Sequence, residues 1–81
     1  MADRDEVLRD LTLMLIYLTS WTEKGFEARR AWKGYDFDVL NELTDAEMIY
    51  GSVRAKSVYL TDEGVERAKA LVAKYGLPDL E

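Results

Sequence analysis

The chain has 81 residues, 48% of them hydrophobic and 33% charged, with a formal net charge of −5 and neither cysteine nor histidine. This composition is typical of a globular protein, and the length allows one domain with a modest core that buries roughly 60% of the unfolded surface. The missing cysteine excludes disulfides and thiolate metal sites. The missing histidine removes the commonest general base and the commonest metal ligand. We therefore expect one soluble domain over residues 1–81 without a cofactor or a metal. Its N-terminus has no apolar segment suited to a signal peptide, so we expect it in the cytoplasm.

Residues 3 to about 20 are predicted to form the first helix. Leu13, Ile16 and Tyr17 point away from its main apolar stripe, so the second half of the helix is apolar nearly all round and needs cover on two sides. That second cover comes either from the last helix or a loop, or from a partner chain. The main stripe consists of Val7, Leu8, Leu11, Met14, Leu15 and Leu18.

Residues 22–34 show no clear period, and we expect an irregular segment with at most a short helical turn around 26–32. A second helix is predicted to follow, with Asp36 as its N-cap. Phe37, Leu40 and Leu43 place apolar side chains at helical spacing along it. This helix should end near residue 45 or 46.

Two short strands are predicted at 48–50 and 56–60, close enough together to form a β-hairpin. Thr61 then caps a last helix over 62–75, which begins with two acidic residues where the helix dipole favours them. Its buried stripe consists of Val65, Ala68, Leu71, Val72 and Tyr75. The residues after Pro78, 79–81, are expected to form a disordered tail.

The predicted order is helix, short or irregular segment, helix, β-hairpin and helix. This order is typical of a small α+β winged-helix-like domain. In such a domain the helix before the hairpin is the one that enters a DNA groove, and the hairpin is the wing.

Three blocks of the sequence, Leu15–Thr19, Ala31–Leu40 and Ala55–Gly64, resemble a family of short bacterial proteins known only as a numbered domain of unknown function. The Trp-Lys-Gly-Tyr-Asp run at 32–36 is the most specific part of the likeness. The resemblance implies the winged-helix-like fold and carries no activity. The family usually has glycine just before the first strand, where this chain has Ala46–Met48, so the preceding helix is expected to end differently.

The charge pattern opposes the usual mode of DNA binding. Between Gly34 and Val53 there is no lysine or arginine, and the same span holds five carboxylates. Phosphate contacts dominate DNA affinity, so a helix with this charge should be repelled from the major groove. The five are Asp36, Asp38, Glu42, Asp45 and Glu47.

A modified form of DNA binding uses a rim of cations outside that helix. The candidate phosphate contacts are Arg29, Arg30 and Lys33 in the Arg29–Lys33 loop, and Arg54 and Lys56 on the wing. The alternative, which we favour, is that these cations pair with the domain's own acids, as on most mixed-charge surfaces.

The large aromatics allow a second class of function, protein binding, because tryptophan and tyrosine are enriched at binding hot spots. For Trp32 and Tyr35 we favour the other interpretation, in which they fill the core beside Phe37.

The better interface candidates belong to the first helix and the residues after it. They are Leu13, Ile16, Tyr17 and Trp21. A homodimer through this helix is the simplest partner, because a symmetric contact needs only one apolar face. The acidic second helix would remain available to a basic protein partner.

Catalysis is not expected, because Ser20, Ser52 and Ser57 have no plausible base beside them and Asp36 and Asp38 do not share a helix face. The sequence therefore predicts a non-enzymatic winged-helix-like protein-interaction or dimerisation module that does not enter a membrane. The alternative is a transcription-regulator-like protein that contacts DNA phosphates through the wing and the Arg29–Lys33 loop.

Overall fold

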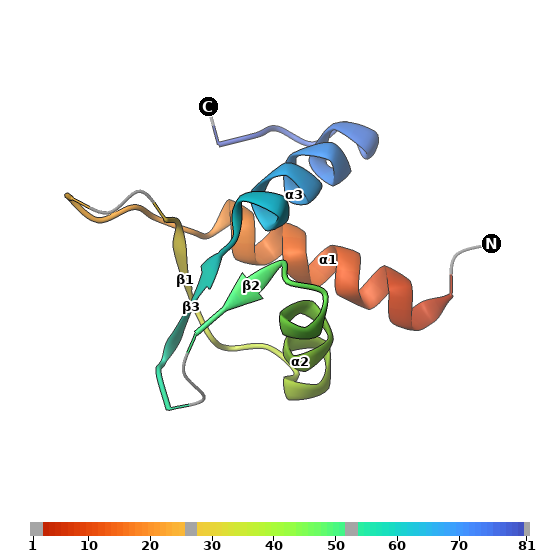
Figure 1. Cartoon of the computed structure of the whole chain (residues 1–81). Coiled ribbons are helices and arrows are strands. Elements are labelled where there is room, and N and C mark those ends of the chain that lie inside the picture. Colours follow the sequence, from red (N-terminus) through yellow and green to blue (C-terminus); the bar gives the residue numbers. More distant parts are fainter. Residues whose placement is uncertain (1–2, 26–27, 52–53, 81) are drawn as a thin grey trace.

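The computed structural model describes residues 3–25, 28–51 and 54–80 and shows three helices and three strands within them (Figure 1). In chain order they are α1 (Arg4–Leu18), β1 (Arg30–Trp32), α2 (Phe37–Asp45), β2 (Ile49–Tyr50), β3 (Ser57–Leu60) and α3 (Asp62–Lys74). The predicted α+β class is confirmed, and the arrangement is consistent with a winged-helix-like domain.

Both N-caps expected from the sequence are present. The Asp36 carboxylate accepts hydrogen bonds from the backbone N–H of Asp38 at 2.8 Å and of Val39 at 3.3 Å. The Thr61 hydroxyl accepts one from the Gly64 N–H at 2.9 Å. Each cap satisfies N–H groups that the helix itself leaves unpaired and stabilises it by about 1 kcal/mol.

Strand β1 was not expected, since the sequence predicted an irregular segment with a short helical turn. The prediction of a helical turn around 26–32 is wrong at residues 30–32, which form a strand, and residues 26–27 lie outside the residues that the structure describes. Three residues are too few to show strand alternation on their own, and β1 exists because it pairs antiparallel with β3, with Ala31 opposite Val58. The predicted hairpin is confirmed, because β2 pairs antiparallel with the other edge of β3. The sheet order is therefore β1-β3-β2.

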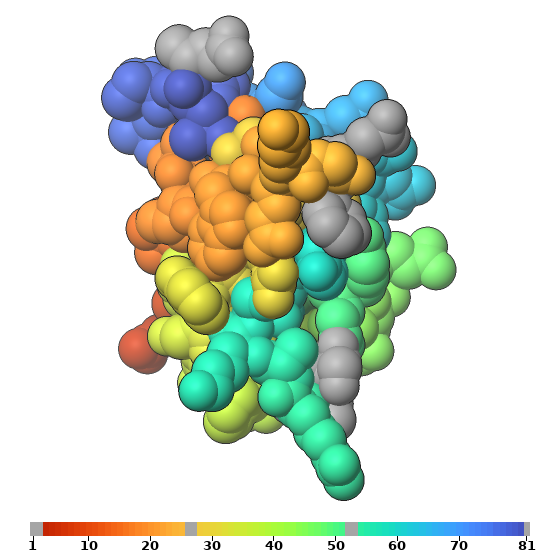
Figure 2. Space-filling view, turned by 90° about the vertical axis from the view of Figure 1, so that its left-hand side faces the viewer, coloured from red at the N-terminus to blue at the C-terminus, as the bar shows by residue number. Residues whose placement is uncertain are grey.

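The sheet has one buried and one outer face. Ala31, Ile49, Val58 and Leu60 point into the core and are at most 5% exposed. The helices lie on that side of the sheet (Figure 1), and Figure 2 views the molecule from the opposite side. The outer face therefore carries the alternate residues of each strand.

The packing of α1 is rotated relative to the prediction. Leu13, Ile16 and Tyr17, expected off the main stripe, are at most 2% exposed and belong to the core. Of the predicted stripe only Met14 is buried, whereas Leu8, Leu11 and Leu15 are 41%, 48% and 50% exposed. The period of an apolar helix does not say which face is covered when apolar residues lie nearly all round. The positions of α2 and α3, which both contact α1, decide it here.

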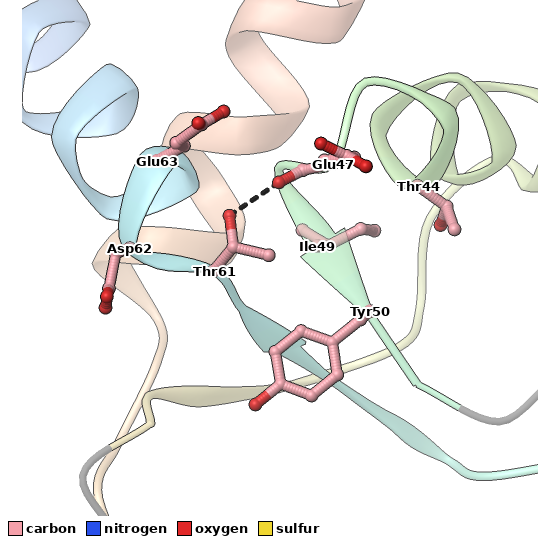
Figure 3. Close-up of a pocket in the computed structure, with 7 residues that line it drawn as sticks. All are labelled: Thr44, Glu47, Ile49, Tyr50, Thr61, Asp62 and Glu63. Atoms are coloured by element: carbon pink, nitrogen blue, oxygen red, sulfur yellow. Dashed lines mark hydrogen bonds between the residues drawn. The ribbon is translucent and has the colours of Figure 1, made fainter.

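The start of α3 is joined to the turn before β2 through Thr61 (Figure 3). The Thr61 hydroxyl donates to the Glu47 carbonyl oxygen at 2.6 Å, and the Met48 carbonyl oxygen lies 3.1 Å from the same hydroxyl. The Thr61 N–H donates to the Met48 carbonyl at 3.0 Å. We call these contacts, together with the cap on Gly64, the Thr61 junction.

Two backbone features follow from this close approach. Glu47, in the turn after α2, adopts a left-handed conformation, φ 61°, at some conformational cost. Gly64 lies against the same turn, and a Cβ built on it would be 2.0 Å from the Met48 carbonyl oxygen.

The end of the described chain is attached to α1. The Tyr17 hydroxyl donates to the Asp79 carboxylate at 2.6 Å, and the Leu80 N–H also donates to it at 2.6 Å. The Tyr17 hydrogen bond, then the Leu80 hydrogen bond and the nearby Lys69 charge, lower the pKa of the Asp79 carboxyl below its ordinary value. Asp79 and Leu80 make these contacts and residue 81 lies outside the described residues, so the disordered tail expected over 79–81 stays a prediction.

Gly64→Ala should destabilise the fold by about 3 kcal/mol, because the new methyl group meets the Met48 backbone and forces α3 away from the sheet. Chemical denaturation measures the change. The matched control is Gly34→Ala, where a Cβ meets nothing within 4 Å and stability should change by under about 1 kcal/mol. Equal effects of the two substitutions would contradict this packing.

Asp79→Asn should reduce stability at neutral pH, and the difference from the wild type should shrink in acid. Because the folded pKa of Asp79 is lowered, its stabilising effect is complete above the unfolded value of about 3.9. The effect is lost as the pH falls through the folded pKa. Unfolding titrations of both proteins between neutral and acid pH measure this difference. A difference that stays constant down to the lowest pH would show that the Asp79 contact does not form.

Candidate functional site

The outer face of the sheet carries most of the exposed aromatic side chains of the described strands. Trp32, Tyr50 and Tyr59 come from the three strands at alternate positions. Trp21 joins them because its backbone N–H and C=O pair with those of Arg30, at 2.8 and 2.9 Å, as an isolated bridge along β1. We call Trp21, Arg30, Trp32, Tyr50 and Tyr59 the aromatic face.

The aromatic residues form two fixed pairs. The ring centroids of Trp21 and Trp32 lie 5.1 Å apart with the planes tilted by 46°, and those of Tyr50 and Tyr59 lie 5.2 Å apart and stack. Contacts of this kind contribute about 0.5–1.5 kcal/mol beyond the buried area. Trp32 is nevertheless 64% exposed and Tyr50 47% exposed, so large apolar surfaces remain open to solvent.

Arg30 lies between the two aromatic pairs and is held on three sides. Its Nε donates to the Ser57 hydroxyl at 2.7 Å, and its Nη1 forms an ion pair with Glu23 at 2.7 Å. Its guanidinium lies 5.5 Å from the centroid of the Tyr59 ring. An exposed ion pair adds little stability. The arrangement does fix where the positive charge stands relative to the rings.

Several of the candidate phosphate contacts bind other groups of the same chain. Arg29 donates from Nε to the Ser20 hydroxyl at 2.6 Å and from Nη2 to the Ser20 carbonyl at 2.9 Å. Arg30 is bonded as described, and Lys33 and Arg54 also interact with other groups. Lys56 is exposed next to the start of β3. Their role in binding DNA stays a prediction.

Three of the four residues predicted to form the partner interface do not reach the surface of the folded chain. Leu13, Ile16 and Tyr17 are buried in the core, so the prediction that these side chains meet a partner is wrong. Trp21 is half-buried and lies on the aromatic face instead. The homodimer itself stays a prediction, but it requires another surface.

Two aromatic residues assigned to the core are also exposed. Trp32 is 64% and Phe37 71% exposed, whereas Tyr35 packs partly against the core as expected. For Trp32 the physical reason is β1, whose alternation turns Ala31 inward and Trp32 outward. The sequence signal for this alternation is Ala31, a small residue between the large side chains of Arg30 and Trp32. No local pattern in the sequence joins Tyr50 to Tyr59, because their proximity depends on the strand register.

A shallow hollow of about 460 Å³ lies beside β2 (Figure 3). Its apolar part comes from Ile49 and Tyr50, and carboxylates of Glu47, Asp62 and Glu63 stand around it. Thr61 also lines the hollow, but its hydroxyl already caps α3. The hollow offers negative charge next to the aromatic face.

Two kinds of feature are absent from the residues that the structure describes. No helix among them is long and apolar enough to cross a bilayer. The described side chains also contain no group of three or more potential metal ligands close enough to hold an ion.

Comparison with known proteins identifies the family. Residues 4–77 match the family model described as "Domain of unknown function (DUF6429)". The chain belongs to this family. The numbered family inferred from the sequence blocks is thereby confirmed as one of unknown function.

The DUF6429 chain also resembles a curated relative. It is 37% identical over 70 residues to "Uncharacterized protein y4hR" from Sinorhizobium fredii (strain NBRC 101917 / NGR234). The aligned residues cover 85% of this chain and 86% of the relative. No solved structure matches this chain.

Proposed function

We propose that this DUF6429 protein is a non-enzymatic protein-interaction module and that the aromatic face is its binding surface. The observation that carries the proposal is the exposed Trp32 side chain, 64% open to solvent yet packed against Trp21. A large apolar side chain held in one position in water is unfavourable unless a partner covers it.

The composition of the aromatic face supports a protein as the partner. Tryptophan, tyrosine and arginine are the residues that dominate the energetics of protein interfaces. Their positions are set before binding by ring contacts and by the hydrogen bonds of Arg30. Preorganisation of this kind lowers the entropy lost on association, so a small surface gains affinity.

The non-enzymatic part of the proposal rests on the chemistry available. The chain has no histidine or cysteine to act as a base or nucleophile at neutral pH. The Thr61 hydroxyl and the Asp36 carboxylate are each used as a helix cap. A cytoplasmic location belongs to the same proposal.

The alternative is a DNA-binding regulator that uses the β2–β3 hairpin as a wing. The exposure of Arg54 and Lys56 at this hairpin is the observation that favours it. The acidic helix α2 opposes it, because five carboxylates at 36–47 would lie near the phosphates. We therefore rank protein binding first.

Trp32→Ala should reduce partner binding by about thirtyfold, the effect of losing a hot-spot side chain worth about 2 kcal/mol. The test immobilises the wild type and the variant and compares, by quantitative mass spectrometry, the proteins each captures from the cells that produce the chain. Phe37→Ala is the matched control, since this aromatic is 71% exposed but begins α2 and lies off the aromatic face. Binding to the captured protein is then measured with purified components.

Two outcomes would contradict the proposal. One is a partner that binds the wild type and Trp32→Ala equally. The other is tight binding to mixed-sequence duplex DNA at low salt that is lost on changing both Arg54 and Lys56 to alanine, which would establish the DNA-binding alternative.

A further inference from the structure

A second exposed apolar surface lies on α1 and shares no residue with the aromatic face. Leu8, Leu11 and Leu15 are 41%, 48% and 50% exposed and follow one another at i, i+3 and i+7. Residues at this spacing lie in a row along one side of a helix. We call the three the leucine row.

One residue of the leucine row, Leu8, lines a groove between α1 and α2. This groove has a volume of about 590 Å³, and Leu8 and Val39 supply its apolar lining. The remaining lining residues are Asp5 and Thr12 on α1, and Asp36, Asp38, Asn41 and Glu42 at the start of and along α2. Four carboxylates thus stand along the groove, and no lysine or arginine is among the described residues that line it.

No lysine or arginine among the described lining residues neutralises this charge, and Asp5 and Asp38 lie in the first turns of α1 and α2, where the helix dipole favours an acid. Asp36 accepts two backbone hydrogen bonds as the cap of α2. The charges of Asp5, Asp38 and Glu42 remain beside a row of half-exposed leucines. A ligand suited to this surface combines apolar side chains in a row with positive charge along one flank.

We propose that the leucine row and the groove bind an amphipathic helix with basic residues from another protein. A helix is the element that presents apolar anchors at i, i+3 and i+7, which matches the spacing of the row it would cover. Charge complementarity along its flank directs encounter and register. α1 has 15 residues and is about 22 Å long, enough for about four turns of a partner helix.

Charge also argues against a second copy of this chain as the occupant. The α1 helix and its cap carry four acids, Asp3, Asp5, Glu6 and Asp10, against two bases, Arg4 and Arg9. A second α1 laid on the groove would therefore bring excess negative charge to four carboxylates. The proposal concerns a surface separate from the aromatic face, so it stands or fails independently of the proposed function.

The test uses a designed helical peptide of leucine and lysine in an amphipathic pattern, and a matched peptide with glutamate in place of lysine. Fluorescence anisotropy measures the binding of each to the full chain. The lysine peptide should bind with an affinity that falls as salt rises, and the glutamate peptide should not bind. Leu11→Gln and Asp38→Asn combined with Glu42→Gln should each weaken binding by about tenfold or more.

Matched controls separate this site from general attraction to an acidic protein. Leu77→Gln removes a leucine that is 44% exposed elsewhere, and Glu63→Gln combined with Glu66→Gln removes two charges on α3. Both controls should retain binding within about twofold. All substituted side chains are exposed, and circular dichroism is used to check that each variant is folded.

Three results would overturn the proposal. Equal binding by the glutamate peptide, or unchanged binding by Leu11→Gln, would show that the leucine row is not the site. Sedimentation of the wild type as a dimer that Leu11→Gln converts to a monomer would identify a second copy as the occupant.

Discussion

The Thr61 junction is the contact on which the rest of this small fold depends. One threonine receives a hydrogen bond from the first turn of α3 and donates to the turn before β2, while its own N–H pairs with Met48. Residues 13 positions apart in sequence are thereby fixed where strand β3 passes into helix α3. The close approach explains why position 64 is glycine and why Glu47 takes a left-handed conformation. A domain of this size has a modest core, so a polar junction that aligns sheet and helix matters more than it would in a larger protein.

The junction has a consequence for the opposite side of the sheet. With β2 and β3 held against α3, Ile49, Val58 and Leu60 face the core, and Tyr50 and Tyr59 must face outward as a stacked pair. Strand β1 then adds Arg30 and Trp32 to the same face. The candidate binding surface is therefore a product of strand alternation on a sheet whose register is fixed from behind. Its apolar side chains are exposed because the inner positions of three short strands already fill the core.

The parts of the fold that could be predicted are those with local physical signals. Asp36 and Thr61 are typical N-cap residues, so the starts of α2 and α3 can be predicted. Val58 and Leu60 alternate with polar or aromatic neighbours, which predicts a strand of the hairpin. The face of α1 could not be predicted, because Leu8, Leu11 and Leu15 satisfy the helical period as well as Leu13, Ile16 and Tyr17 do. The choice is made by α2 and α3. Strand β1 was missed for a related reason, since three residues form a strand only through pairing with β3. The aromatic face depends on β1 and on the strand register. The sequence therefore shows that these aromatic residues exist but does not predict that they lie on one face.

The fold requires that the Thr61 junction stays closed in the native protein. Native-state hydrogen exchange of the Gly64 amide tests it most directly, because a first-turn amide normally exchanges fast unless a cap holds it. We expect the Gly64 amide to exchange only through global unfolding, with the same opening free energy as the buried Leu71 amide within α3. A Gly64 amide that exchanges at the rate of an exposed first-turn amide while Leu71 stays protected would contradict it.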